Sequence, residues 1–236
     1  MSTVNIKSSC STHNIYDVTF HGDRIQTLVT NSPSVVESWI SEIELTHRSG
    51  LKNLIVGLDT EHNCKNEHPL ATLQLCVGNR CLIFQIIHAS YIPQALQNFL
   101  LNDNYSFVGV KVEEDVEKLE NDYNLSVGNV IDLRTLTAQV LGQDMKEWKQ
   151  AGLKSLSEKV LKKKIEKPKE ITLSEWDNRS LFSAQVQYAC LDAFVSYEIG
   201  RTLKTGSLSS SSSSSLSPGL LLMGSLTALA FAIYKS

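Results

Sequence analysis

An apolar run that ends in two carboxylates decides the fold: Leu54-Ile55-Val56-Gly57-Leu58-Asp59-Thr60-Glu61. Four of its first five residues are branched aliphatics, which predicts a strand buried on both faces in the middle of a mixed or parallel sheet. Side chains alternate along a strand, so Asp59 and Glu61 point to the same side. Two unpaired anions there would repel each other unless a positive charge lies between them. The run therefore suggests a divalent metal, although acidic residues at strand ends are also common in ordinary loops.

The composition predicts one globular domain with appendages. The chain has 236 residues, 42% hydrophobic and 20% charged, which suffices for one well-buried domain but not for two large ones. A formal net charge of -3 argues against binding of nucleic acid by overall positive charge, although a local basic patch is compatible with it. Residues 1–15 are polar and are expected to be disordered.

The cysteines and the start of the chain favour a cytoplasmic or nuclear protein over a secreted one. The first residues contain no apolar core of a signal peptide. The cysteines form no Cys-x-x-Cys pair and lack the histidine spacing of a zinc site, so they are expected to be reduced thiols. They are Cys10, Cys64, Cys76, Cys81 and Cys190.

Strands and helices are expected on both sides of residues 54–61. Residues 16–29 alternate apolar and polar side chains around His21-Gly22-Asp23, which predicts a hairpin. Gly78-Asn79 is a favourable turn pair for a second hairpin. Further strands are expected at residues 72–77, 81–86, 106–110 and 130–133. Helices are expected at residues 35–43, 91–101, 113–123, 134–141 and 183–203.

Residues 146–169 form a basic segment that the overall charge conceals. They contain nine lysines and only three acidic residues. A run of this kind is usually a solvated helix face followed by a loop, and Lys162-Lys163-Lys164 also fits a nuclear import signal. The third interpretation is contact with a phosphate backbone, which would make Lys162, Lys163 and Lys164 nucleic-acid-binding residues.

The composition changes again near residue 206. Nine serines between residues 207 and 217 predict a flexible linker at residues 205–218. Residues 219–236 form an apolar tail and a candidate membrane anchor, which would leave the domain on the cytosolic side. Its uncharged stretch is shorter than the ~20 residues that usually span a bilayer. A disordered or loosely packed tail is the alternative.

Four carboxylates and a tyrosine occur in a defined order: Asp59, Glu61, Asp115, Tyr188 and Asp192. Tyr188 and Asp192 are four residues apart and share one helix face, as ordinary surface pairs also do. With the motifs around them, these residues resemble the DEDDy branch of the 3'-5' exonucleases, which includes ribonuclease D and the Werner-syndrome exonuclease domain. The motifs are Val-Gly-Leu-Asp-Thr-Glu (56–61), Thr-Leu-Gln-Leu-Cys (72–76), Val-Gly-Val-Lys-Val-Glu-Glu-Asp (108–115) and Tyr-Ala-Cys-Leu-Asp-Ala (188–193).

The resemblance covers roughly residues 50–203. It implies an α/β ribonuclease H-like fold, with a mixed sheet and helices on both faces, and we place the exonuclease domain at residues 16–204. The family pattern has no fifth metal carboxylate at Asp132, so this residue is interpreted as structural or adjacent to the substrate. Glu113 and Glu114 are expected to be exposed.

The resemblance also implies a site for two divalent ions, Mg²⁺ or Mn²⁺, which prefer hard oxygen ligands. It implies that Asp59 bridges both ions and that Glu61 and Asp192 complete the first position. Asp115 would hold the second ion, partly through water. Tyr188 would hydrogen-bond and orient the attacking water, because its pKa is too high for a strong base.

The substrate is expected to be single-stranded nucleic acid. The hairpin at residues 16–29 and the lack of helicase segments resemble small plant exonucleases. These include the RISC-interacting clearing exoribonucleases, ring-shaped oligomers that degrade short RNA. This resemblance favours RNA over DNA and a homo-oligomer. The alternatives are a Werner-like DNA 3'-5' exonuclease and a catalytically inactive nucleic-acid-binding or scaffold protein. The intact set of five residues favours an enzyme.

Overall fold

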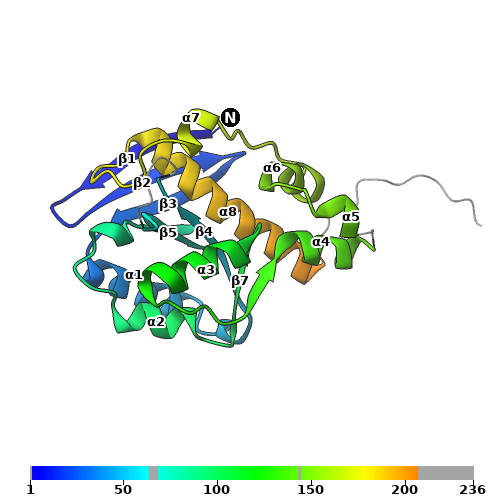
Figure 1. Ribbon diagram of the computed structural model, residues 1–236, viewed down its shortest axis with the longest axis horizontal. Helices are drawn as coiled ribbons and strands as arrows, with labels where there is room; N and C mark the ends of the chain where they lie inside the picture. Colours follow the sequence, from blue (N-terminus) through cyan, green and yellow to red (C-terminus); the bar gives the residue numbers. More distant parts are fainter. Residues whose placement is uncertain (1, 64–68, 143–144, 207–236) are drawn as a thin grey trace, which may run out of the picture.

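The computed structural model describes residues 2–63, 69–142 and 145–206 (Figure 1). The apolar tail at 219–236 and all but the first two residues of the expected linker lie outside these ranges. Within them, no helix combines the length and the apolar character needed to cross a bilayer. The described cysteines Cys10, Cys76, Cys81 and Cys190 are free thiols.

In the described part of the chain, eight strands form one mixed sheet in the order β1-β2-β3-β6-β5-β4-β7-β8 (Figure 1). The strands are β1 Ser2–Ser9, β2 His13–Phe20, β3 Asp23–Thr30, β4 Leu54–Glu61, β5 Thr72–Val77, β6 Arg80–Phe84, β7 Tyr105–Gly109 and β8 Val130–Asp132. The apolar run at residues 54–61 is β4, as predicted. It lies between β5, to which it is antiparallel, and β7, to which it is parallel.

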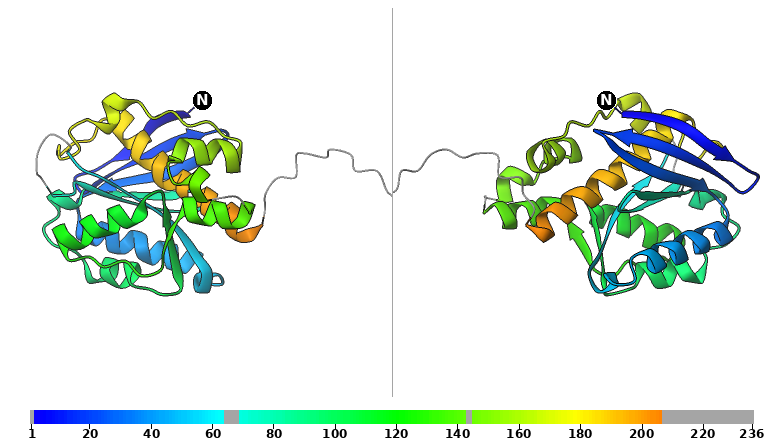
Figure 2. Two further views of the ribbon diagram at one scale, coloured as in Figure 1. Left: turned by 45° about the vertical axis from the view of Figure 1, so that its right-hand side comes forward. Right: turned by 180° about the vertical axis from the view of Figure 1, so that it is seen from behind.

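Helices cover both faces of the sheet, which confirms the expected architecture (Figures 1 and 2). The longer helices are α1 Pro33–Thr46, α2 Gln94–Leu100, α3 Val112–Tyr123, α4 Leu133–Leu141 and α8 Ser183–Thr205. Shorter helical segments are η1 Leu51–Asn53, η2 Ile86–His88, α5 Met145–Trp148, α6 Leu153–Leu156, η3 Ser157–Leu161 and α7 Lys169–Thr172. The basic segment is thus a series of short helical segments, interrupted by residues 162–168, which have no regular secondary structure and begin with Lys162 in the left-handed conformation.

Two hydrophobic cores hold the helices against the sheet. On one face, α1, α2 and α3 bury Trp39, Phe99 and their neighbours against β4, β5 and β7. On the other face, α8 packs Ala189 and Phe194 against the sheet, and the short helices around it add Trp148. The core between α8 and the sheet holds α8 at a fixed distance from the strands.

Gly57 allows α8 to approach β4 closely. A Cβ atom at this position would lie 2.0 Å from the carbonyl oxygen of Ala193, so only a glycine fits. The backbone of α8 therefore rests directly on β4, two residues before Asp59. This contact brings Asp192, the residue before Ala193, to the acidic end of the strand.

The expected disorder at residues 1–15 is wrong for β1 and for the start of β2. Residues 2–9 form an edge strand antiparallel to β2, with Val4 opposite Val18 and a register shift between Ile6 and Ser8. The side-chain amide of Gln187 on α8 donates a hydrogen bond to Ser2 Oγ over 2.6 Å. The prediction failed because it was based on polar composition. An edge strand is stabilised by main-chain pairing, which composition does not reveal.

The predicted hairpin at residues 16–29 is present as β2 and β3. His21 and Gly22 form its turn with φ angles of 48° and 93°. Positive φ at both turn positions matches the right-handed twist of the two strands. The turn lies at the N-terminal end of β3, which runs parallel to β6 and in the same direction as β4.

Candidate active site

Three carboxylates meet where β4 passes under α8. Asp59 and Glu61 project from the end of β4 and Asp192 from α8, and one oxygen of each lies within 4.8 Å of the others. Among the described residues, Asp59 Oδ2 is buried and has no hydrogen-bond partner. A buried anionic oxygen without a partner is costly, so this cluster fits a cation.

The electrostatics of the cluster agree with this fit. Burial raises the pKa of Asp59 well above its usual value, and the charges of Asp192 and Glu61 raise it further. Burial and the charge of Asp192 likewise raise the pKa of Glu61. The donors are hard carboxylate oxygens, which suit Mg²⁺ and Mn²⁺.

Asp115 approaches the same region from the first turn of α3. In the described chain it is not one of the three residues whose oxygens lie within 4.8 Å, but its charge contributes to the raised pKa values of Asp59 and Glu61. The Thr60 hydroxyl donates a hydrogen bond to Asp115 Oδ1. Burial raises the pKa of Asp115 to about 7, while this hydrogen bond opposes the shift. Asp115 is thus held beside the cluster rather than inside it.

Tyr188 lies one helical turn before Asp192 on α8. Its hydroxyl accepts a hydrogen bond from Thr172 Oγ1 over 2.9 Å, and its ring packs against Trp176. Burial raises the pKa of Tyr188 to about 12, and the charge of Asp192 acts in the same direction. The phenol therefore stays protonated at neutral pH, which rules it out as a strong base.

Lys167 is a member of the site that the sequence did not reveal. Its Nζ forms an ion pair with Asp192 Oδ2 and lies 4.8 Å from the centre of the Tyr188 ring. Burial would lower the pKa of Lys167, but the charges of Asp192 and Asp59 outweigh burial and raise it. In the sequence it is one of nine lysines in the basic segment, and no spacing links it to Asp192.

Two of the three lysines predicted to bind nucleic acid, Lys163 and Lys164, contact the β2–β3 turn. Lys163 pairs with Asp23 over 2.6 Å, and the Lys164 carbonyl accepts a hydrogen bond from His21 Nε2 over 3.0 Å. Lys162 and Lys164 have exposed side chains. β3 and β4 run in the same direction, so this turn, which precedes β3, and Glu61, which ends β4, lie at opposite ends of the strands. No contact between these three lysines and the carboxylates is present in the described part of the chain; Lys167, further along the same segment, makes that contact.

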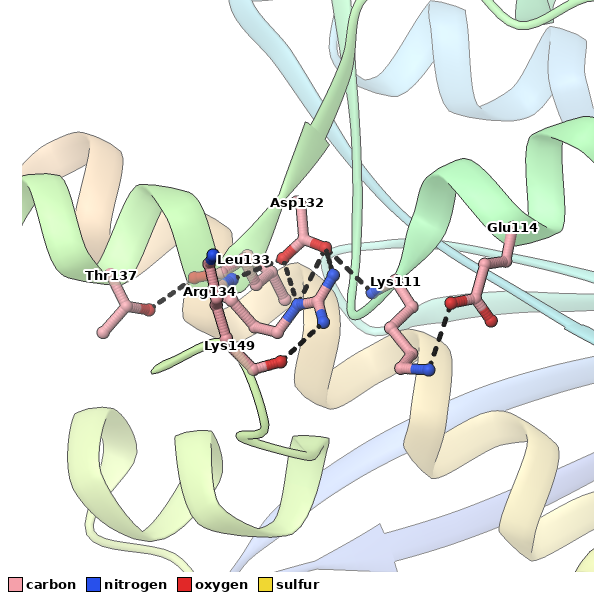
Figure 3. A network of polar contacts seen from close by, with 7 residues as sticks. All are labelled: Lys111, Glu114, Asp132, Leu133, Arg134, Thr137 and Lys149. Carbon is pink, nitrogen blue, oxygen red and sulfur yellow. Dashed lines mark hydrogen bonds and ion pairs between the residues drawn. The ribbon is translucent and has the colours of Figure 1, made fainter. Parts of the chain in front are cut away.

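Asp132 has a structural position, in agreement with its exclusion from the site. Figure 3 shows its carboxylate between the start of α4 and the residue before α3. It accepts hydrogen bonds from the Arg134 backbone N–H over 2.7 Å and from the Lys111 backbone N–H over 3.1 Å, and the Arg134 guanidinium pairs with it. Glu113 and Glu114 are exposed, as expected, and Glu114 pairs with Lys111.

Comparisons with known proteins agree with this arrangement. The family model described as "3'-5' exonuclease" matches residues 31–206. A "3'-5' exonuclease" of Arabidopsis thaliana is 38% identical over 136 residues, covering 57% of this chain and 46% of the relative. The mouse "Bifunctional 3'-5' exonuclease/ATP-dependent helicase WRN" is 31% identical over 145 residues, covering 59% of this chain and 10% of that protein. The chain thus spans less than half the length of these relatives.

A solved structure shows the same fold. The crystal structure of Escherichia coli RNase D, described as "an exoribonuclease involved in structured RNA processing", superimposes with a TM-score of 0.60 at 19% identity. The match covers 75% of this chain and 44% of that one. At this identity the likeness concerns the fold, and it confirms the expected α/β ribonuclease H-like architecture.

Proposed function

Because the chain belongs to the 3'-5' exonuclease family of the DEDDy type, we propose that it removes nucleotides from the 3' end of single-stranded nucleic acid, with RNA favoured over DNA. The observation that carries this proposal is the cluster of Asp59, Glu61 and Asp192, whose oxygens lie within 4.8 Å of one another around the unpartnered Asp59 Oδ2. The described part of the chain offers this cluster one contacting cation, Lys167, at Asp192. The remaining negative charge is suited to divalent ions.

Asp59, Glu61 and Asp192 would hold the first of two ions, Mg²⁺ or Mn²⁺. Asp59 would also contact the second, with Asp115. When bound, such ions supply Lewis-acid stabilisation of the phosphate and of the leaving oxygen. The raised pKa values of the carboxylates support this assignment, because a divalent charge favours their ionised forms. Thr60 would keep the Asp115 carboxylate oriented.

Tyr188 would position the attacking water. Its hydroxyl oxygen already accepts a hydrogen bond from Thr172, so its own proton is available to donate to a water oxygen. Because its pKa is about 12, it stays a donor over the neutral pH range. Such a contact fixes where the lone pairs of the water point, and positioning of this kind contributes to the rate without proton transfer to the phenol.

The preference for RNA rests on the resemblance to small plant exoribonucleases. A DNA exonuclease is the second candidate, and it rests on the resemblance to the Werner-syndrome exonuclease domain; the mouse WRN protein is 31% identical over 145 residues. A catalytically inactive nucleic-acid-binding protein is disfavoured, because Asp59, Glu61 and Asp192 converge and Asp115 is held beside them.

The test is a degradation assay on the purified chain. Single-stranded RNA, single-stranded DNA and recessed duplex DNA, each labelled at the 5' end, are incubated with Mg²⁺ or Mn²⁺. We expect a ladder of shortened products, fastest from RNA, that EDTA and Asp59→Asn abolish. A faster ladder from DNA would establish the second candidate. Binding without any ladder, or equal ladders from the wild type and Asp59→Asn, would contradict the exonuclease proposal.

We also propose a homo-oligomer, cytoplasmic or nuclear location, and membrane attachment through residues 219–236. The oligomer is supported by the resemblance to ring-shaped exoribonucleases and by the position of β1 at the edge of the sheet, where a second copy could add a strand. Light scattering of the purified chain tests the oligomer. Cell fractionation with and without residues 219–236 tests the location, and release from membranes on deletion is the expected result.

A further inference from the structure

Lys167 occupies a position that a metal ligand set would not normally contain. Its ammonium is bound to Asp192 Oδ2 and lies over the Tyr188 ring, so one cation touches two residues of the proposed site. The Asp192 side chain is 3% exposed and the Lys167 side chain 30% exposed. The pair is therefore largely shielded from solvent, so the attraction between its two charges is screened less than in a surface ion pair.

The chain holds Lys167 in this place from both sides. Before it, Lys163 is paired with Asp23 on the β2–β3 turn, and the Ile165 side chain is buried in the core under α8. After it, Pro168 leads into α7, where Thr172 donates its hydrogen bond to Tyr188. Residues 162–168 thus form a strap that is anchored on both sides of Lys167 and so places its side chain at Asp192.

A metal ion and this ammonium need the same carboxylate. Asp192 is one of three residues whose oxygens lie within 4.8 Å of one another, and a divalent ion bound there would be coordinated by its carboxylate. Two cations held on one carboxylate repel each other, and the repulsion is strong where solvent screening is weak. Repulsion therefore opposes simultaneous binding of both cations at Asp192.

We propose that Lys167 is the resident counter-ion of the acidic cluster, and that a divalent ion must displace its ammonium from Asp192 in order to bind. Lys167 stabilises the metal-free protein by neutralising a buried carboxylate, and for the same reason it weakens metal binding. Loading of the site releases the Lys167 side chain from Asp192. This inference rests on the proposed function, because it takes the carboxylates to be metal ligands.

The test is a calorimetric titration of the full chain with Mn²⁺. Lys167→Met removes the charge and keeps most of the apolar stem, and Lys169→Met is the matched control, because Lys169 is exposed two residues away. We expect Lys167→Met to bind Mn²⁺ about tenfold more tightly, a typical size for coupling between two binding events. Lys169→Met should bind like the wild type. In EDTA, Lys167→Met should melt at a lower temperature than the wild type, and Mn²⁺ should reverse the order.

Asp59→Asn separates failure of this inference from failure of the proposed function. If Asp59→Asn binds Mn²⁺ as well as the wild type, the metal site lies elsewhere and both proposals fall. If Asp59→Asn loses binding while Lys167→Met equals the wild type or binds more weakly, the counter-ion proposal alone is overturned.

A second measurement needs no variant. Lysines of the wild-type chain are acylated with an N-hydroxysuccinimide ester, with and without Mn²⁺, and the sites are mapped by mass spectrometry. Displacement predicts that Mn²⁺ increases labelling of Lys167 several-fold and leaves Lys169 unchanged. Labelling of Lys167 that stays constant or falls with Mn²⁺ would contradict displacement.

Discussion

The Thr60 hydroxyl donates a hydrogen bond to Asp115 Oδ1 over 2.5 Å and so joins the acidic end of β4 to the first turn of α3. Thr60 lies between Asp59 and Glu61 in the sequence, but its side chain points to the opposite face of the strand. One strand therefore supplies two carboxylates on one face and, on the other, the donor that orients a third.

Thr60→Val should weaken the site without removing a carboxylate. The isosteric change deletes the hydrogen bond that opposes the rise in the pKa of Asp115, so this pKa should rise above about 7. Loss of a group that orients a ligand typically costs about 10–100-fold in metal affinity or activity. Degradation kinetics in Mn²⁺ measure the activity, and calorimetric titration measures the metal affinity. Thr60→Ser keeps the hydroxyl and should behave like the wild type; equal kinetics for Thr60→Val would show that Asp115 needs no such support.

Asp132→Asn tests the stability that Asp132 contributes at neutral pH. Burial would raise the pKa of Asp132, but hydrogen bonds from Arg134 and from the Lys111 N–H outweigh it and hold this pKa below its usual value. A lowered pKa stabilises the fold above the unfolded value of about 4, and this stabilisation is lost as the pH falls through the folded pKa. Asp132→Asn should therefore cost about 2 kcal/mol near pH 7 and progressively less in acid.

Urea unfolding in EDTA at several pH values measures this difference. Glu114→Gln is the matched control, because Glu114 belongs to the same polar network but is exposed (Figure 3). Its effect should stay within about 0.5 kcal/mol at every pH. A penalty for Asp132→Asn that grows as the pH falls would contradict the structural role assigned to its carboxylate.

Particular residues show how far the sequence predicts this site. The apolar run before Asp59 predicted a central strand, and alternation along it placed Glu61 on the same side. The order of the family motifs selected Asp192, and the structure places it within 4.8 Å of Asp59 and Glu61. Lys167 could not be found this way, because its contact depends on how the strap crosses from the β2–β3 turn to α8. The edge strand at residues 2–9 was missed for a related reason, since pairing with β2 determines it.

Lys162, Lys163 and Lys164 should contribute unequally to nucleic-acid binding. Lys163 is already paired with Asp23, whereas Lys162 and Lys164 are exposed. Removal of one phosphate-binding lysine reduces the slope of log affinity against log salt by about 0.7 for single strands. Lys162→Ala/Lys164→Ala should therefore lower that slope, and Lys163→Ala should leave it nearly unchanged. Fluorescence anisotropy with labelled RNA at several salt concentrations measures the slopes. All proteins carry Asp59→Asn in addition, so that the RNA is not degraded during the measurement. Equal slopes for all proteins would place the phosphates elsewhere.

Gly57→Ala should separate the two elements that build the site. The added Cβ would lie 2.0 Å from the Ala193 carbonyl oxygen, so α8 must move away from β4 and carry Asp192 with it. Overpacking of this kind typically costs about 1–3 kcal/mol, and a clash with rigid backbone belongs at the upper end. Urea unfolding measures the loss, and titration with Mn²⁺ should show weaker binding even where the protein remains folded. Gly152→Ala is the control, because a Cβ there meets no atom of the described chain within 4 Å. A Gly57→Ala protein with wild-type stability and Mn²⁺ affinity would mean that the carboxylates do not depend on the close approach of α8 to β4.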